Sequence, residues 1–112
     1  MNQRDKLIQK YAIDLKDKFD VDVNMDLLKR VTIACGPSIY NRDSASISSS
    51  EESELERVKT NFLIKKLGLD PNVDFDTPIT SIMNRYGKTN RTKYRVVVYY
   101  LLVKHFGKED IY

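Results

Sequence analysis

The chain has 112 residues, of which 41% are hydrophobic and 31% charged, and a net charge of +3; this is the length of one domain, with too much apolar content for wholesale disorder. Its single cysteine, Cys35, excludes an intrachain disulfide. The first residues are charged, and the most apolar run, Val96 to Val103, is far shorter than the ~20 residues of a membrane span, so we expect a cytoplasmic protein with no membrane contact.

Two helices are predicted in the first third of the chain. Apolar residues recur every four positions from Leu7 to Phe19, which indicates an amphipathic helix that ends near Phe19. Asn24 is placed to cap a second helix, because its side chain can accept a backbone N–H of the first turn. Gly36 and Pro37 end this helix, since proline cannot continue its hydrogen bonds.

A serine-rich loop at about residues 41–50 precedes a third predicted helix. Ser49 and Glu52 have the spacing of a capping box, and apolar residues follow at helical intervals as far as Leu67. Gly68 favours the end of this helix, because glycine adopts the left-handed conformation at little cost.

The last part of the chain predicts a short helix and a longer one. Thr77 is the expected cap of the short helix, which Gly87 ends. The longer helix is expected from about Asn90 to Phe106, just before Gly107. Its middle is rich in Val and Tyr, as strands are, but its length favours a helix and no second strand-like run exists to pair with it.

Together these elements predict an all-α fold. We expect a single compact helical domain over residues 1–112 with about five helices. The last helix is apolar on all sides of its middle turns, which is the pattern of a buried helix. We therefore expect this apolar C-terminal helix to be central and the other helices to surround it.

Charge is distributed unevenly along the chain. Between Thr77 and Lys108 there are seven Lys or Arg residues and no Asp or Glu, whereas the first 76 residues carry 12 basic and 14 acidic residues. Five of the seven cations lie around the predicted start of the last helix, where unpaired backbone N–H groups already create positive potential. This placement is unfavourable unless an anion binds there.

These five cations form the predicted site, which we call the basic turn. The expected anion-binding residues are Lys88, Arg91, Arg95, Arg85 and Lys93. Tyr86 and Tyr94 flank them and could stack on bases, as aromatic side chains do in single-strand binders. Acidic residues of the first three helices, such as Glu54, Glu56 or Asp17, would instead neutralise the basic turn and make it structural.

No catalytic or metal site is predicted. His105 is the only histidine, and Cys35 is expected near a helix C-terminus, where the dipole disfavours a thiolate. The alternating polar residues from Asp20 to Asp26 lack the glycine and the closing glutamate of a calcium loop. We expect no metal and no cofactor, and the sequence favours a protein without enzymatic activity; a pocket that joins His105, a carboxylate and the basic turn would favour an enzyme.

Three stretches carry a family resemblance: Gly36 to Asn41, Asn61 to Leu69, and Tyr99 to Lys108. With Tyr86-Gly87-Lys88 and Asn90-Arg91 between them, the chain resembles a family of small bacterial proteins known only as domain of unknown function 2853. The resemblance spans nearly the whole chain and implies a bacterial, stand-alone, all-helical protein. Because the family has no assigned activity, it implies no catalytic or binding residue.

The sequence leaves two functions open. The first is a small non-enzymatic binding protein whose basic turn contacts nucleic-acid phosphates or another anionic ligand. The alternative is a protein-protein interaction or oligomerisation module with no ligand site, because Tyr99, Tyr100 and Tyr112 offer a large contact area wherever they are exposed.

Overall fold

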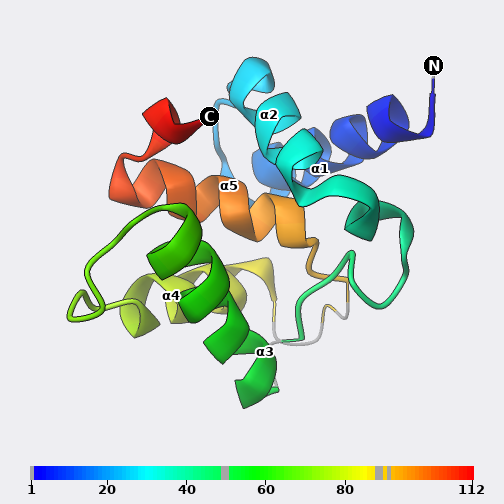
Figure 1. Ribbon diagram of the computed structural model, residues 1–112. Coiled ribbons are helices and arrows are strands. Elements are labelled where there is room, and N and C mark those ends of the chain that lie inside the picture. Colours follow the sequence, from blue (N-terminus) through cyan, green and yellow to red (C-terminus); the bar gives the residue numbers. More distant parts are fainter. Residues whose placement is uncertain (1, 49–50, 88–89, 91) are drawn as a thin grey trace.

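Figure 1 shows the computed structural model of the chain, which describes residues 2–48, 51–87, 90 and 92–112. The regular elements in these residues are all helices. The described residues form no strand, and their one β-type pairing is an isolated bridge between Ser46 and Tyr94. The α-helices are α1 (Gln3–Phe19), α2 (Met25–Cys35), α3 (Glu52–Arg57), α4 (Asp76–Tyr86) and α5 (Arg95–Phe106). The predicted all-α class and the predicted number of helices are therefore confirmed.

Three shorter segments join or extend these helices. Two are 3₁₀ turns, η1 (Gly36–Tyr40) after α2 and η3 (Glu109–Ile111) after α5. The third, η2 (Val58–Lys66), is a π-helix that continues α3. Its buried residues include Val58, Phe62 and Leu63, and the spacing of four and five residues matches the wider i to i+5 ladder of a π-helix.

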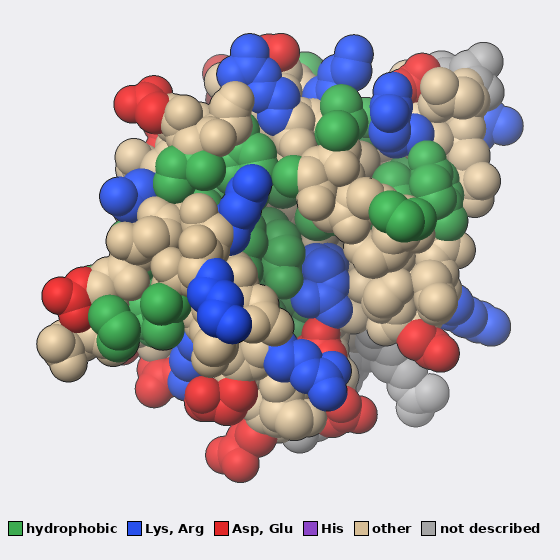
Figure 2. Space-filling model, in the orientation of Figure 1, with side chains coloured by type: hydrophobic (Ala, Val, Ile, Leu, Met, Phe, Trp, Pro, Cys, Tyr) green, Lys and Arg blue, Asp and Glu red, His purple; other side chains and the backbone are tan. Residues whose placement is uncertain are grey.

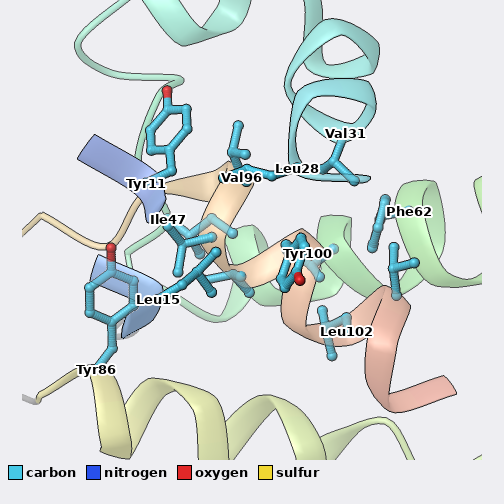
Figure 3. Packing of buried hydrophobic residues seen from close by; sticks show 14 of the residues in the cluster. Tyr11, Leu15, Leu28, Val31, Ile47, Phe62, Tyr86, Val96, Tyr100 and Leu102 are labelled. Atoms are coloured by element: carbon cyan, nitrogen blue, oxygen red, sulfur yellow. The ribbon is translucent and has the colours of Figure 1, made fainter. Parts of the chain in front are cut away.

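The core is built around α5, as the sequence predicts. Six of its residues are buried, and α1, α2 and α4 each pack against it. The helix crosses the middle of the molecule in Figure 1, with α2 above it and α4 below it. Figure 3 shows side chains from the surrounding helices converging on Val96, Tyr100 and Leu102. Because α5 is apolar on all sides, burial at the centre is its most stable position.

The first two helices begin at side-chain caps. The Asn2 Oδ1 atom accepts a hydrogen bond from the Asp5 backbone N–H at 2.8 Å, and the Asn24 Oδ1 atom accepts one from the Leu27 N–H at 3.1 Å. The backbone N–H of Asn24 also donates to the Tyr100 hydroxyl at 2.9 Å. The predicted cap at Asn24 is thus present, and it fixes the start of α2 to the centre of α5.

The fourth helix begins slightly earlier than the sequence predicts. We expected Thr77 as its cap, but α4 starts at Asp76, and the Asp74 Oδ1 atom accepts a hydrogen bond from the Thr77 N–H at 3.2 Å. An aspartate three residues before a free backbone N–H is as good a cap as threonine. This places the Asp74 carboxylate at the N-terminal end of α4.

The last helix begins later than predicted, at Arg95 rather than Asn90. The residues before it pair with a distant loop: the Ile47 N–H donates to the Lys93 carbonyl at 2.8 Å, and the Arg95 N–H donates to the Ala45 carbonyl at 2.9 Å. The Asn90 side chain also accepts the Thr92 N–H at 3.1 Å, which closes a local turn. Backbone groups used in these bonds are not available to a helix.

The predicted third helix is divided between α3 and η2. The Glu51 residue precedes its first turn and makes no side-chain cap bond. Ser49, the expected first member of a capping box with Glu52, lies outside the described residues.

Candidate functional site

The basic turn does not form a single cluster in the described part of the chain. Lys88 and Arg91 lie outside the described residues. Arg85 is exposed at the C-terminal end of α4, whereas Lys93 is buried and Arg95 is half-buried at the start of α5. The three described cations therefore have different environments.

Arg95 is held by partners from three parts of the chain. Its Nη2 atom forms an ion pair with the Glu54 carboxylate of α3, and the two side chains are only 17% and 15% exposed. Its Nε atom donates to the Ser44 carbonyl at 2.8 Å, and its Nη1 atom donates to the Tyr99 hydroxyl at 2.9 Å. Each nitrogen of the guanidinium has a protein partner, so Arg95 joins α5 to α3 and to the serine-rich loop.

Lys93 is also engaged within the protein. Its side chain is 3% exposed, and its Nζ atom donates a hydrogen bond to the Asn90 carbonyl. A carbonyl dipole at hydrogen-bonding distance stabilises the ammonium group without a ligand. At this burial, Lys93 presents almost no surface to an incoming anion.

The two tyrosines of the basic turn belong to the core. Tyr86 is 2% exposed, and its hydroxyl donates to the Asp14 carboxylate at 2.5 Å. Burial and the nearby Asp14 charge raise the pKa of Tyr86 above its ordinary value. The half-buried Tyr94 ring meets the Tyr11 ring edge to face, with 5.1 Å between the centroids. The buried Tyr86 ring has no face on which a base could stack.

Arg85 differs from the other described cations of the basic turn because most of its guanidinium is free. Its Nε atom donates to the Lys18 carbonyl at 3.3 Å, and the guanidinium lies 6.0 Å from the centre of the Phe19 ring. In the described structure, neither Nη group has a protein partner. The Nε bond and the ring contact fix the orientation of this cation while its two Nη groups remain available.

Arg85 lines a groove between α4 and α5 that has a volume of about 660 Å³. This volume lies within the range typical of small-molecule sites. Most of its surface is apolar, and it is formed by Phe19, Val21, Val73, Pro78, Ile82, Leu101 and Phe106. The polar residues in its lining are Asp74, Thr77, Ser81, Arg85 and His105. We call this concavity the α4–α5 groove.

The polar residues of the groove follow one face of α4. Thr77, Ser81 and Arg85 are spaced four residues apart, which places them in a row along the helix, and Asp74 extends the row at its N-terminal end. A hydrogen bond from the Thr77 side chain is the main cause that lowers the pKa of Asp74, so this carboxyl is ionised at neutral pH. The row therefore begins with an anion and ends with a cation.

His105 shares the groove with Asp74 and Arg85, which is the combination that would favour an enzyme. Its ring lies edge to face with that of Phe106, with 4.8 Å between the centroids. In the residues that the structure describes, His105 makes no hydrogen bond with Asp74 or Ser81. A general base needs such a bond to a nucleophile or to an orienting group, so the groove presents binding groups without a formed catalytic pair.

A second concavity lies over α5, between η2 and the end of α2. It consists of two hollows of about 230 and 350 Å³, and Asn61 and Tyr99 line both of them. Figure 2 shows this face, with hydrophobic side chains at its centre, Lys and Arg side chains around them, and Asp and Glu side chains gathered over α3. Its cations already have partners: Arg95 and Arg57 face Glu54, and Lys66 lies over the Tyr112 ring. It is therefore less suited to an anion than the α4–α5 groove.

The sequence draws attention to Arg85 and His105 but gives no sign of the groove that joins them. Neither Asp74 nor Ser81 is among the residues that the sequence predicts to bind a ligand. The spacing of four between Thr77, Ser81 and Arg85 was a usable signal, because such residues share one helix face. The apolar wall from Phe19 and Leu101 has no comparable signal, because these residues lie far apart in the sequence.

The comparisons with known proteins identify the family. A family model described as "Protein of unknown function (DUF2853)" matches residues 10–110, so the chain belongs to this family, as the resemblance indicated. A search of curated proteins found no match.

Two further searches concern the described residues only. None of their helices combines the length and the apolar character that crossing a membrane requires. Within the same residues, no three His, Cys, Asp or Glu side chains come together in a way that could hold a metal ion.

Proposed function

We propose that this protein is a non-enzymatic binding protein whose α4–α5 groove takes a small amphipathic anion. The apolar part of the ligand lies along the groove, and its carboxylate or phosphate group meets Arg85. The observation that carries the proposal is a pre-oriented guanidinium with unpartnered Nη groups at the edge of an apolar cavity of about 660 Å³. A planar guanidinium offers two parallel N–H groups to such an anion.

The other cations of the basic turn that the structure describes support a small anion rather than a nucleic acid. A nucleic-acid surface needs several exposed cations that follow a phosphate backbone. Arg95 is paired with Glu54, and Lys93 is buried. Arg85 stands beside an apolar groove, which matches a ligand with one charged group and a hydrocarbon or aromatic body.

The proposal is tested by titrating the ¹⁵N-labelled protein with decanoate and with decanol and following the amide spectrum. We expect decanoate to shift the amides of α4 and of the end of α5, and decanol to bind more weakly. Arg85→Gln should weaken decanoate binding about fivefold, the size of one partly exposed charged contact, and leave decanol unchanged. Arg57→Gln, which removes an exposed arginine outside the groove, is the matched control. The proposal is contradicted if the amide shifts caused by decanoate map away from the groove. It is also contradicted if Arg85→Gln and Arg57→Gln lose decanoate affinity equally.

The alternative function is an interaction or oligomerisation module. The side chains that support it differ from the tyrosines that the sequence suggested. Tyr100 is fully buried, and the Tyr99 ring is stacked on Phe62 at 3.7 Å, so neither forms a free contact surface. Exposed large hydrophobic side chains favour this alternative, among them Ile13 at 58% and Ile33 and Tyr40 at 49% each. Sedimentation velocity over a hundredfold concentration range tests it: an oligomer that Ile33→Lys dissociates supports it, and a monomer throughout opposes self-association.

A further inference from the structure

The two ends of the α4–α5 groove carry opposite charges. The N-terminal end of α4 holds Asp74, and its last turn holds Arg85, and both side chains line the same cavity. From Asp76 to Arg85 the helix rises about 14 Å at 1.5 Å per residue. Asp74 and Arg85 therefore lie at opposite ends of α4, and apolar lining side chains such as Pro78 and Ile82 lie between them in the sequence.

The packing of α5 shows which of its groups lie at the Asp74 end. Figure 1 shows that α4 and α5 run in opposite directions, so the end of α5 lies beside the start of α4. The Phe75 and Phe106 rings meet edge to face with 6.0 Å between their centroids, which fixes this arrangement. His105 therefore belongs to the Asp74 end, whereas Phe19 and Lys18 adjoin Arg85 at the other end.

Asp74 has acceptor capacity beyond its role as a cap. Its Oδ1 atom accepts the Thr77 N–H at 3.2 Å, and the carboxylate is exposed. A carboxylate offers about four acceptor positions on its two oxygens, and the bonds from the Thr77 side chain and from the backbone N–H groups of Thr77 and Asp76 do not use all of them. The remaining positions are available to a hydrogen-bond donor in the groove.

On this basis we propose that the ligand of the groove is bifunctional: an acid at one end, held by Arg85, and an amine at the other end, held by Asp74, joined by an apolar body about as long as α4. This inference rests on the proposed function, since it concerns the same groove. The chemical class is an ω-amino acid with a medium-length apolar chain. The charge at each end then meets its opposite, and the apolar body covers the groove floor.

The test compares decanoate with 10-aminodecanoate, two probes of equal chain length that differ in the terminal amine. The amine changes the hydration of the chain as well as its charge, so the informative quantity is the ratio of the two dissociation constants. The decanoate constant divided by the 10-aminodecanoate constant should be about threefold larger for the wild-type protein than for Asp74→Asn. This factor corresponds to the free energy of an exposed ion pair. Asparagine keeps a side-chain oxygen for the cap, so α4 should remain folded.

Two control variants distinguish the outcomes. Asp70→Asn removes the same charge from the same segment between η2 and α4, and it keeps the side-chain bond to the Asn72 N–H. Because Asp70 does not line the groove, the ratio for this variant should equal that of the wild type. Arg85→Gln should weaken both probes by the same factor. A ratio that Asp74→Asn leaves unchanged, while decanoate still binds, overturns the bifunctional ligand and leaves the proposed function standing. Failure of both probes to bind overturns the proposed function itself.

Discussion

Replacing Arg95 with Met tests whether the charge at the start of α5 is structural. The substitution removes the ion pair with Glu54 and the hydrogen bonds to the Ser44 carbonyl and the Tyr99 hydroxyl, while the methionine retains most of the apolar packing. Removing one partner of a buried ion pair costs about 3 to 5 kcal/mol, because the other charge stays buried without a partner. Since both side chains keep some exposure, at 17% and 15%, and Glu54 retains a longer ion pair with the exposed Arg57 at 3.8 Å, we take the lower end, about 3 kcal/mol.

For a chain of 112 residues, this loss of free energy corresponds to a decrease in melting temperature of about 13 °C. Thermal and urea unfolding followed by circular dichroism at 222 nm measure it. Lys104→Met, an exposed position on the same helix, is the matched control and should change the stability by less than about 0.5 kcal/mol.

A double substitution separates the ion pair from general damage to the fold. Arg95→Met combined with Glu54→Leu leaves no unpaired buried charge, because Arg57, the other partner of Glu54, is exposed. The double variant should therefore be more stable than the sum of the two single losses predicts. Folded Arg95→Met should also bind decanoate as the wild type does, because Arg95 does not line the α4–α5 groove. If the unfolding free energy of Arg95→Met lies within about 0.5 kcal/mol of the wild-type value, the pair with Glu54 does not hold α5 to α3, and the structural explanation fails.

Three further predictions concern single groups. Tyr86→Phe removes the donor to the half-buried Asp14 carboxylate and should lower the unfolding free energy by about 1 to 2 kcal/mol in urea titrations. Burial raises the pKa of Cys35 from 9.0 to about 11, so the folded state keeps this proton to higher pH than the unfolded state does; stability should fall as the pH rises from about 9 to 11, and less steeply in Cys35→Ala. Asp74→Ala should cost about 1 kcal/mol through loss of the α4 cap, whereas Asp74→Asn should stay within a few tenths, as thermal melts would show.

The features of the fold that depend on local sequence were predictable. Asn24 caps α2 through a bond to a residue three positions away, and Gly107 ends α5 in the left-handed conformation at φ 66°. The start of α5 was not predictable in this way. Its position depends on backbone bonds between residues 93–95 and residues 45–47, and a pattern confined to the last helix contains no information about this distant loop.

The same distinction explains the basic turn. Arg85 and Arg95 have equal charge and lie ten residues apart, so the sequence gives no reason to assign them different roles. The carboxylate that neutralises Arg95 comes from Glu54, 41 residues earlier in the chain, whereas the Nη groups of Arg85 meet no carboxylate in the described structure. A cation's capacity to bind an external anion depends on its unpaired donors rather than on its charge alone. Charge counting therefore treats the two arginines alike, and only the pairing of each guanidinium distinguishes Arg85, whose Nη groups have no partner among the described residues, from Arg95.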